Sequence, residues 1–171
     1  LEPRTHADVQ RVLRTVAEAI GVPRSEADRV WREIDAGVQA AVQSLKPQAR
    51  SLRVYFEVSP TPYGASESSF IGETLLRMGV RNILPAALGP FPQINPEFVV
   101  RAQPDVIMAG DSSRASMLQR PGWAQMRAVR EDRICVFQPE QADIVVRAGP
   151  RMAEGARLMA ECLNRTAGGA R

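Results

Sequence analysis

Four side chains with binding chemistry lie in loops that follow predicted strands: Tyr63, Phe91, Asp143 and Arg147. Ligands of open α/β sheets bind at the edge where the strands have their carboxyl ends. Aromatic rings among prolines, with one acid and one arginine, suit a rigid site that stacks on a flat ligand and hydrogen-bonds its polar fringe. The alternatives are that the rings pack locally under their loops and that Asp143 and Arg147 form a solvated ion pair.

Residues for catalysis are scarce. His6 is the single histidine, so a His-based triad would have to use it and a His-rich metal site cannot be built. The loop after the first predicted strand contains neither G-x-G-x-x-G nor G-K-[ST], which argues against a nucleotide site. No pair of carboxylates has a context that predicts a shifted pKa, so general acid–base catalysis is unsupported. We therefore expect a protein that is not an enzyme and has no metal or cofactor of its own.

The two cysteines, Cys135 and Cys162, lie in apolar surroundings without C-x-x-C or zinc spacing. Buried free thiols are the simpler interpretation, and a disulfide is the alternative if the compartment is oxidising. The sequence leaves both open.

Composition indicates one domain with a proper core, since 44% of the 171 residues are hydrophobic and 24% are charged. The net charge is +3, but the arginines are interleaved with 19 acidic residues and form no basic run, so we expect no nucleic-acid binding. No apolar run approaches the ~20 residues of a membrane span. The first residues contain no signal-peptide stretch, so we expect any export signal to have been removed or never present.

Two helices are predicted before any strand. The first covers Thr5–Ile20 and is broken by glycine and proline at 21–23. The second, Ser25–Leu45, carries one apolar stripe, with Ser25 as its cap and Pro47 as its stop. At ~1.5 Å per residue it is about 30 Å long, the diameter of a small domain.

Strands and helices then alternate. We expect strands at 52–58, 82–84, 105–109 and 133–137, and helical segments from Ser66 or Ser68 to Met78, at 96–103, 114–118 and 122–129. Asn95 should cap the helix that begins at Pro96. A loop at 138–149 should lead to a last helix at 150–164 and a frayed tail. Apolar strands separated by helices predict an α/β fold, a mainly parallel sheet of four to five strands covered on both faces.

Four segments carry a family resemblance, and they cover almost everything after Leu52. They are PYGASESSFIGETLLRMGVRNI, FPQINPEFVVRAQPDVIMAG, WAQMRAVREDRICVF and DIVVRAGPRMAEGARLMAECL. In this order and spacing they resemble the C-terminal part of ABC-transporter substrate-binding proteins of the long-helix class, which capture vitamin B12 (cobalamin), iron siderophores or haem. The members that bind vitamin B12 are the most similar.

The resemblance implies two Rossmann-like α/β lobes joined by one long helix, with the ligand between them, in the periplasm. Residues 1–23 would be the end of the N-terminal lobe, 24–47 the interlobe helix, 48–165 the C-terminal lobe and 166–171 a tail. Most of the first lobe would lie outside this chain. Apolar residues at the Arg24 end of the long helix should then lack partners within the chain.

By the same resemblance, Tyr63 and Phe91 match ligand-contacting aromatics, and Asp143 with Arg147 matches a polar pair at the ligand's fringe. Glu97 matches a glutamate that docks into an arginine pocket on the membrane permease; its simpler interpretation is a helix N-terminal carboxylate. The implied function is delivery of a metal chelate to the permease, without catalysis. The alternatives are a lobe of a nitrogenase-like metal-cofactor enzyme, which would need cysteines in loops, and a free-standing α/β interaction domain, which would need an acidic cluster after the first strand.

Overall fold

The computed structural model describes residues 2–110 and 114–168. Helices and strands alternate after an initial helix pair, in the order α1 (His6–Ala19), α2 (Arg24–Gln43), β1 (Arg53–Ser59), β2 (Tyr63–Gly64), α3 (Phe70–Arg77), β3 (Arg81–Asn82), α4 (Pro96–Ala102), β4 (Val106–Ala109), α5 (Arg114–Leu118), α6 (Arg127–Arg130), β5 (Ile134–Val136), α7 (Pro139–Val146) and α8 (Met152–Ala167). Short 3₁₀ turns lie at Pro47–Ala49, Ala86–Leu88 and Trp123–Gln125. The predicted α/β fold is confirmed.

One five-stranded sheet organises the chain, in the order β2-β1-β4-β5, with β3 also paired to β1. The pairs β1–β3, β1–β4 and β4–β5 are parallel. Among the strands of the described residues, β2 alone pairs antiparallel, and its register with β1 shifts between Glu57 and Ser59. Tyr63 was expected in a loop, and this is wrong, because Tyr63 and Gly64 form the short strand β2.

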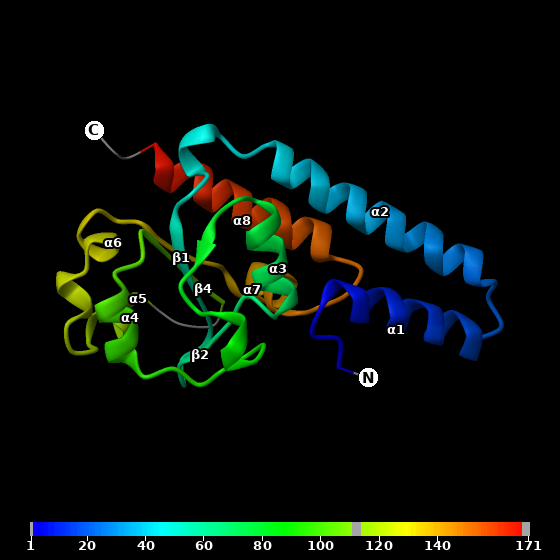
Figure 1. Cartoon of the computed structure of the whole chain (residues 1–171), viewed down its shortest axis with the longest axis horizontal. Coiled ribbons are helices and arrows are strands. Elements are labelled where there is room, and N and C mark those ends of the chain that lie inside the picture. Colours follow the sequence, from blue (N-terminus) through cyan, green and yellow to red (C-terminus); the bar gives the residue numbers. More distant parts are fainter. Residues whose placement is uncertain (1, 111–113, 169–171) are drawn as a thin grey trace.

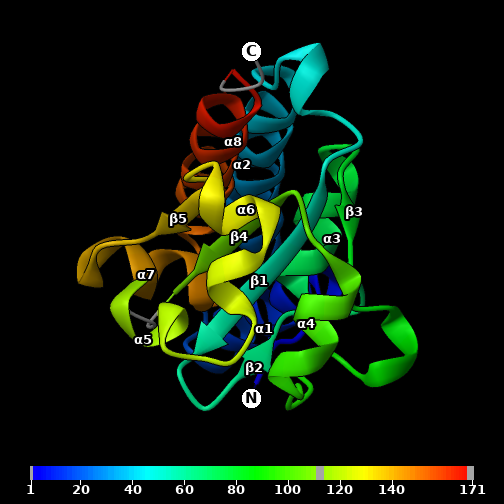
Figure 2. The ribbon, with the colours of Figure 1, turned by 90° about the vertical axis from the view of Figure 1, so that its left-hand side faces the viewer.

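Helices cover both faces of the sheet. Alternate side chains of β1 point to opposite faces, so Val54 and Phe56 join one core while Tyr55 joins the other. The first core lies under α1, α2, α3, α7 and α8, and the second under α4, α5 and α6. Figure 2 shows this layering, with α4 and α6 in front of β1 and β4 and with α1 and α2 behind them.

The long helix α2 is confirmed, but its start differs from the prediction. The residue before the helix is Pro23, which has extended backbone, and Ser25 lies inside the first turn rather than capping it. Towards its C-terminal end the helix buries an apolar stripe: Ile34, Val38, Ala41 and Val42. At the other end, Ile20 is 70% exposed, and Val16 and Val22 are also exposed. Those three residues belong to the end of α1 and its connection to α2, which projects beyond the sheet in Figure 1. On the long helix itself, Ala27 is buried and Val30 and Trp31 pack against the first core, so the expectation that apolar residues at its Arg24 end lack partners is wrong for these three.

Other helices also differ from the prediction. Ser69, not Ser66 or Ser68, caps α3 by accepting a hydrogen bond from the Gly72 amide. The segment predicted as a loop at 138–149 contains α7, which has Pro139 at its first position and a capping box made by Gln138 and Gln141. Helix α8 continues to Ala167, past the predicted end, because Thr166 is buried. By contrast, Asn95 caps α4 as predicted.

A disulfide joins Cys135 of β5 to Cys162 of α8, with 6.1 Å between the two Cα atoms. Of the two states that the sequence allows, the structure therefore has the bridged one. It ties the last strand to the last helix across the first core, and both cysteines are buried.

A charged pair lies in the second core. Glu57 of β1 is fully buried, and Arg120 reaches it with Nη1–Oε2 and Nη2–Oε1 distances of 2.6 and 2.9 Å. The Tyr55 hydroxyl donates to the same carboxylate at 3.1 Å. The Arg120 guanidinium also lies over the Trp123 ring, 4.6 Å from its centroid. The hydrogen bond to Glu57 raises the pKa of Arg120, and burial raises the pKa of Tyr55.

Candidate functional site

A cavity of about 790 Å³ opens between segments that are distant in the sequence. Its lining comes from the residues before α1, the start of α3, the loop after β3 and the end of α7: Glu2, Pro3, Arg4, Phe70, Leu88, Gly89, Pro90, Phe91, Val146, Arg147 and Ala148. Its volume is that of a typical small-molecule site. Of the residues predicted for the site, it contains Phe91 and Arg147.

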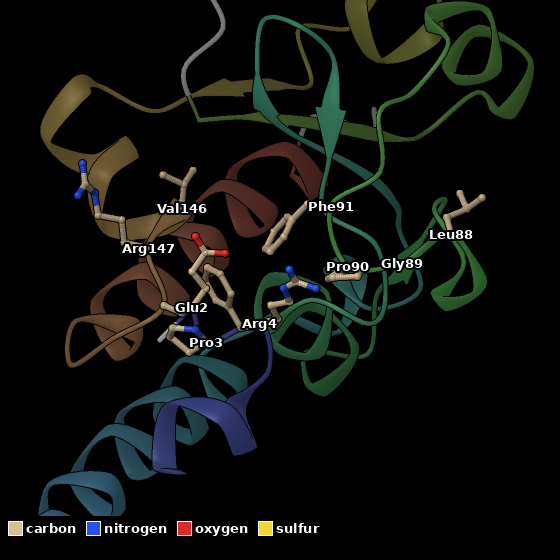
Figure 3. Close-up of a pocket in the computed structure, with 11 residues that line it drawn as sticks. Glu2, Pro3, Arg4, Leu88, Gly89, Pro90, Phe91, Val146 and Arg147 are labelled. Atoms are coloured by element: carbon tan, nitrogen blue, oxygen red, sulfur yellow. The ribbon is translucent and has the colours of Figure 1, made fainter. Parts of the chain in front are cut away.

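Phe91 provides the aromatic wall of this cavity. Its ring is half-buried and meets the Phe70 ring edge-on, with 6.0 Å between the ring centroids. In Figure 3 the Phe91 ring points into the hollow. An aromatic face that is supported from behind and open in front can stack on a flat apolar ligand.

Backbone hydrogen bonds hold the loop that carries Phe91. The Ser66 amide donates to the Pro90 carbonyl at 3.0 Å, and the Ser66 hydroxyl donates to the Gly89 carbonyl at 2.6 Å. The Gly64 amide donates to the Pro92 carbonyl at 3.0 Å. Gly89 has φ of 80°, a conformation that glycine adopts without strain. The ring is therefore positioned before any ligand arrives, partly by Ser66, which is itself buried.

Tyr63 does not line the cavity. It lies on β2, its side chain is 40% exposed, and its backbone forms an isolated bridge with Gln93. The pairing links the Tyr63 and Phe91 loops, but it leaves the two rings in different surroundings.

Asp143 and Arg147 form an exposed ion pair at the end of α7, with 3.0 Å between Arg147 Nη2 and Asp143 Oδ1. Asp143 lines a neighbouring cavity of about 360 Å³ together with Arg147. In Figure 3 the Arg147 guanidinium points away from the Phe91 ring. The pair thus lies at the rim, in the solvated arrangement that contributes little to stability.

The segment before α1 forms a wall that sequence reasoning missed. The Phe70 amide donates to the Arg4 carbonyl at 2.6 Å, which fixes this segment against the start of α3. The Thr5–Asp8 capping box then starts α1. That capping signal is visible in the sequence, but the contact with a residue 66 positions later is not.

His6 strengthens the same junction. Its Nε2 lies 2.9 Å from the Thr74 hydroxyl and 3.1 Å from the Phe70 carbonyl, and its ring meets Trp31 edge-on. Burial lowers the pKa of His6, although nearby Glu73 opposes the shift. His6 therefore has a packing role that joins α1, α2 and α3.

Glu97 lies outside the cavity, in the first turn of α4. Its side chain is 73% exposed, and the closest ion-pair contact is a loose one of 3.9 Å to Arg101. This carboxylate is available to a partner, and its docking role stays a prediction.

The described residues contain no cluster of three or more His, Cys, Asp and Glu side chains that could hold a metal ion. Within the same residues, no helix has both the length and the apolar character of a membrane span. What the cavity offers is apolar contact on one wall and charge at its edges.

Comparison with known proteins gives a consistent assignment. The sequence profile of the family described as periplasmic binding protein matches residues 1–140. An uncharacterised ABC transporter substrate-binding lipoprotein of Bacillus subtilis (strain 168), YvrC, is 26% identical over 167 residues, which are 95% of this chain and 52% of the relative. The chain thus spans about half the length of this curated relative.

Solved structures of other proteins share the fold, and two of them illustrate the likeness. The periplasmic haem-binding protein RhuT from Roseiflexus sp. RS-1, in its apo form, has a TM-score of 0.73 at 23% identity, over 97% of this chain and 65% of that chain. The periplasmic vitamin B12-binding protein BtuF of Vibrio cholerae has a TM-score of 0.70 at 18% identity, over 96% of this chain and 64% of that chain. At these identities the likeness shows the fold alone.

Proposed function

The chain belongs to the periplasmic binding protein family, and we propose that it forms the interlobe helix and C-terminal lobe of the solute-binding component of an ABC importer. The whole protein would have a second lobe before this one and would hold a metal chelate between them. It would not be an enzyme; it would bind its ligand outside the cytoplasm and deliver it to a membrane permease.

The observation that carries this proposal is the Phe91 ring, which lies on a hydrogen-bonded loop and lines an open cavity of about 790 Å³. The loops that hold it follow strands of an α/β sheet, where ligands of such sheets bind. A macrocyclic or catecholate chelate offers the flat, partly apolar surface that an aromatic wall binds. Proteins of the same fold bind haem and vitamin B12, and we extend those two ligand classes, with ferric siderophores, to this chain.

Two further features support the proposed arrangement. The exposed Val16, Ile20 and Val22 give residues 1–23 an apolar surface that a preceding lobe would cover. The Cys135–Cys162 disulfide suits an oxidising compartment outside the cytoplasm. It also removes support for the nitrogenase-like alternative, because the two cysteines are bonded to each other and are not in loops.

Replacing Phe91 by alanine tests the ligand site. In the two-lobe protein we expect chelate affinity to fall about 10- to 100-fold, because a central aromatic anchor is lost. Isothermal titration calorimetry would measure this fall. Phe98→Ala is the matched control, since Phe98 is a half-buried phenylalanine on α4 outside the cavity lining. Equal affinity of wild type and Phe91→Ala for every chelate would overturn the assignment.

We also propose that Asp143 and Arg147 contact the polar fringe of the ligand and that Tyr63 contacts the ligand from β2.

We propose further that the exposed Glu97 carboxylate docks with the permease. Glu97→Ala should leave ligand affinity unchanged and slow uptake in cells by about tenfold, because a charged contact at the interface is lost. Glu140→Ala, which removes another first-turn carboxylate on α7, is the control. Normal uptake by Glu97→Ala would reduce Glu97 to a helix N-terminal carboxylate.

A further inference from the structure

Arg4 lies in the wall of the Phe91 cavity with its backbone fixed at both ends. Its carbonyl accepts from the Phe70 amide at 2.6 Å, and its amide donates to Asp8 Oδ2 at 3.0 Å. The side chain therefore leaves the backbone at a defined place. In Figure 3 its guanidinium extends beside Pro90, on the side of the hollow towards which the Phe91 ring points.

The Arg4 guanidinium has no carboxylate within ion-pair distance among residues 2–110 and 114–168, although acids are near in sequence. Asp8 is used by Arg11, at 2.8 Å. Arg147, the other arginine of the lining, is paired with Asp143. Arg4 is thus the cation of this cavity whose charge is left for a group that enters it.

We propose that Arg4 binds an acidic group at the edge of the chelate, so that the cleft prefers a carboxylate-bearing chelate to a neutral one. This inference rests on the proposed function and narrows its ligand class. A planar guanidinium presents paired N–H donors that match the two oxygens of a carboxylate. A flat chelate with acidic side chains, such as haem with its propionates, could stack on Phe91 and place a carboxylate at its edge beside Arg4. The amide fringe of cobalamin would offer Arg4 only neutral acceptors.

Glu2 opposes the preference for a carboxylate-bearing chelate, because its own carboxylate lines the same cavity. In Figure 3 it points into the hollow with Arg4 and Phe91. A carboxylate on the ligand would be attracted by Arg4 and repelled by Glu2. Neutralising these two residues should therefore change affinity for an acidic chelate in opposite directions.

The experiment titrates the two-lobe protein with haemin, with haemin dimethyl ester and with cyanocobalamin. We expect wild type to bind haemin most tightly. Arg4→Gln should lower haemin affinity about 10- to 100-fold, the usual effect of losing a charge-assisted hydrogen bond, and should leave affinity for the ester unchanged. Arg4→Lys should keep most of the haemin affinity, and Glu2→Gln should raise it a few-fold. Arg130→Gln, at an exposed arginine outside the cavity, is the control for net charge.

Several results would overturn the inference while leaving the proposed function in place. They are equal affinity of wild type for haemin and its ester, an equal loss for both ligands in Arg4→Gln, and tight binding of cyanocobalamin alone. Binding of no chelate by wild type would overturn the proposed function and this inference with it. A urea unfolding curve for each variant separates lost binding from lost folding.

Discussion

Arg120→Ala is expected to lower the free energy of unfolding by about 3–5 kcal/mol, the usual cost of breaking a buried ion pair from one side. The Glu57 carboxylate has no solvent exposure, and Arg120 contacts both of its oxygens. Without the guanidinium, the carboxylate stays buried in the second core and loses its bidentate partner. Urea unfolding followed by tryptophan fluorescence would measure the change.

Two companion variants show whether the loss comes from the buried charge. Arg157→Ala breaks an exposed pair with Glu161 on α8 and should change stability by about 1 kcal/mol or less. Adding Glu57→Gln to Arg120→Ala should recover part of the loss, because the uncompensated charge is gone. A loss below about 1 kcal/mol in Arg120→Ala would mean that the pair is not structural.

Removing the disulfide is the second large effect. The bridge joins cysteines 27 residues apart, and the chain-entropy estimate for a loop of this length is about 3–4 kcal/mol. We expect the variant Cys135→Ala/Cys162→Ala to lose about that much in urea unfolding. The closed loop contains α7, so the end of this helix should also become more susceptible to proteolysis.

Reduction of the wild type provides the matched test. Dithiothreitol should bring wild type down to the stability of the double variant and should leave the variant unchanged. If wild type keeps its full stability after a thiol assay has shown complete reduction, the bridge does not support the fold.

Strands β1, β3, β4 and β5 were predicted to within one or two residues because each is a short apolar run between proline, glycine or polar residues. Strand β1 is an example. Its residues Val54, Tyr55 and Phe56 are all buried, so the strand is apolar on both faces and is easily recognised in the sequence. The cap of α4 was also predictable, since Asn95 and Pro96 are neighbours and act locally.

Errors arose where a residue's role depends on contacts distant in the sequence. Ser66 was a reasonable helix cap by type, but its hydroxyl donates to Gly89, 23 residues later. In the sequence Glu57 resembles an ordinary strand residue, because its ion-pair partner Arg120 is 63 residues away. The two-residue strand β2 carries too little sequence to be recognised without its partner β1.

The same distinction applies to the candidate site. Phe91 could be identified because its loop is rich in proline and follows a strand. Arg4 could not, because it precedes the first helix and enters the cavity only through its contact with Phe70. Tyr63 was predicted beside Phe91 from its loop, and pairing in β2 places it outside the cavity lining instead.

Titration with haemin, cyanocobalamin and a ferric siderophore, in parallel on the two-lobe protein and on these 171 residues alone, tests the proposed function most directly. We expect saturable binding of at least one chelate by the two-lobe protein, and an affinity about 100-fold or more lower for the single lobe, because half of the cleft is missing. Saturable binding of none of the three by the two-lobe protein, or equal affinity of both proteins, would contradict a ligand held between two lobes.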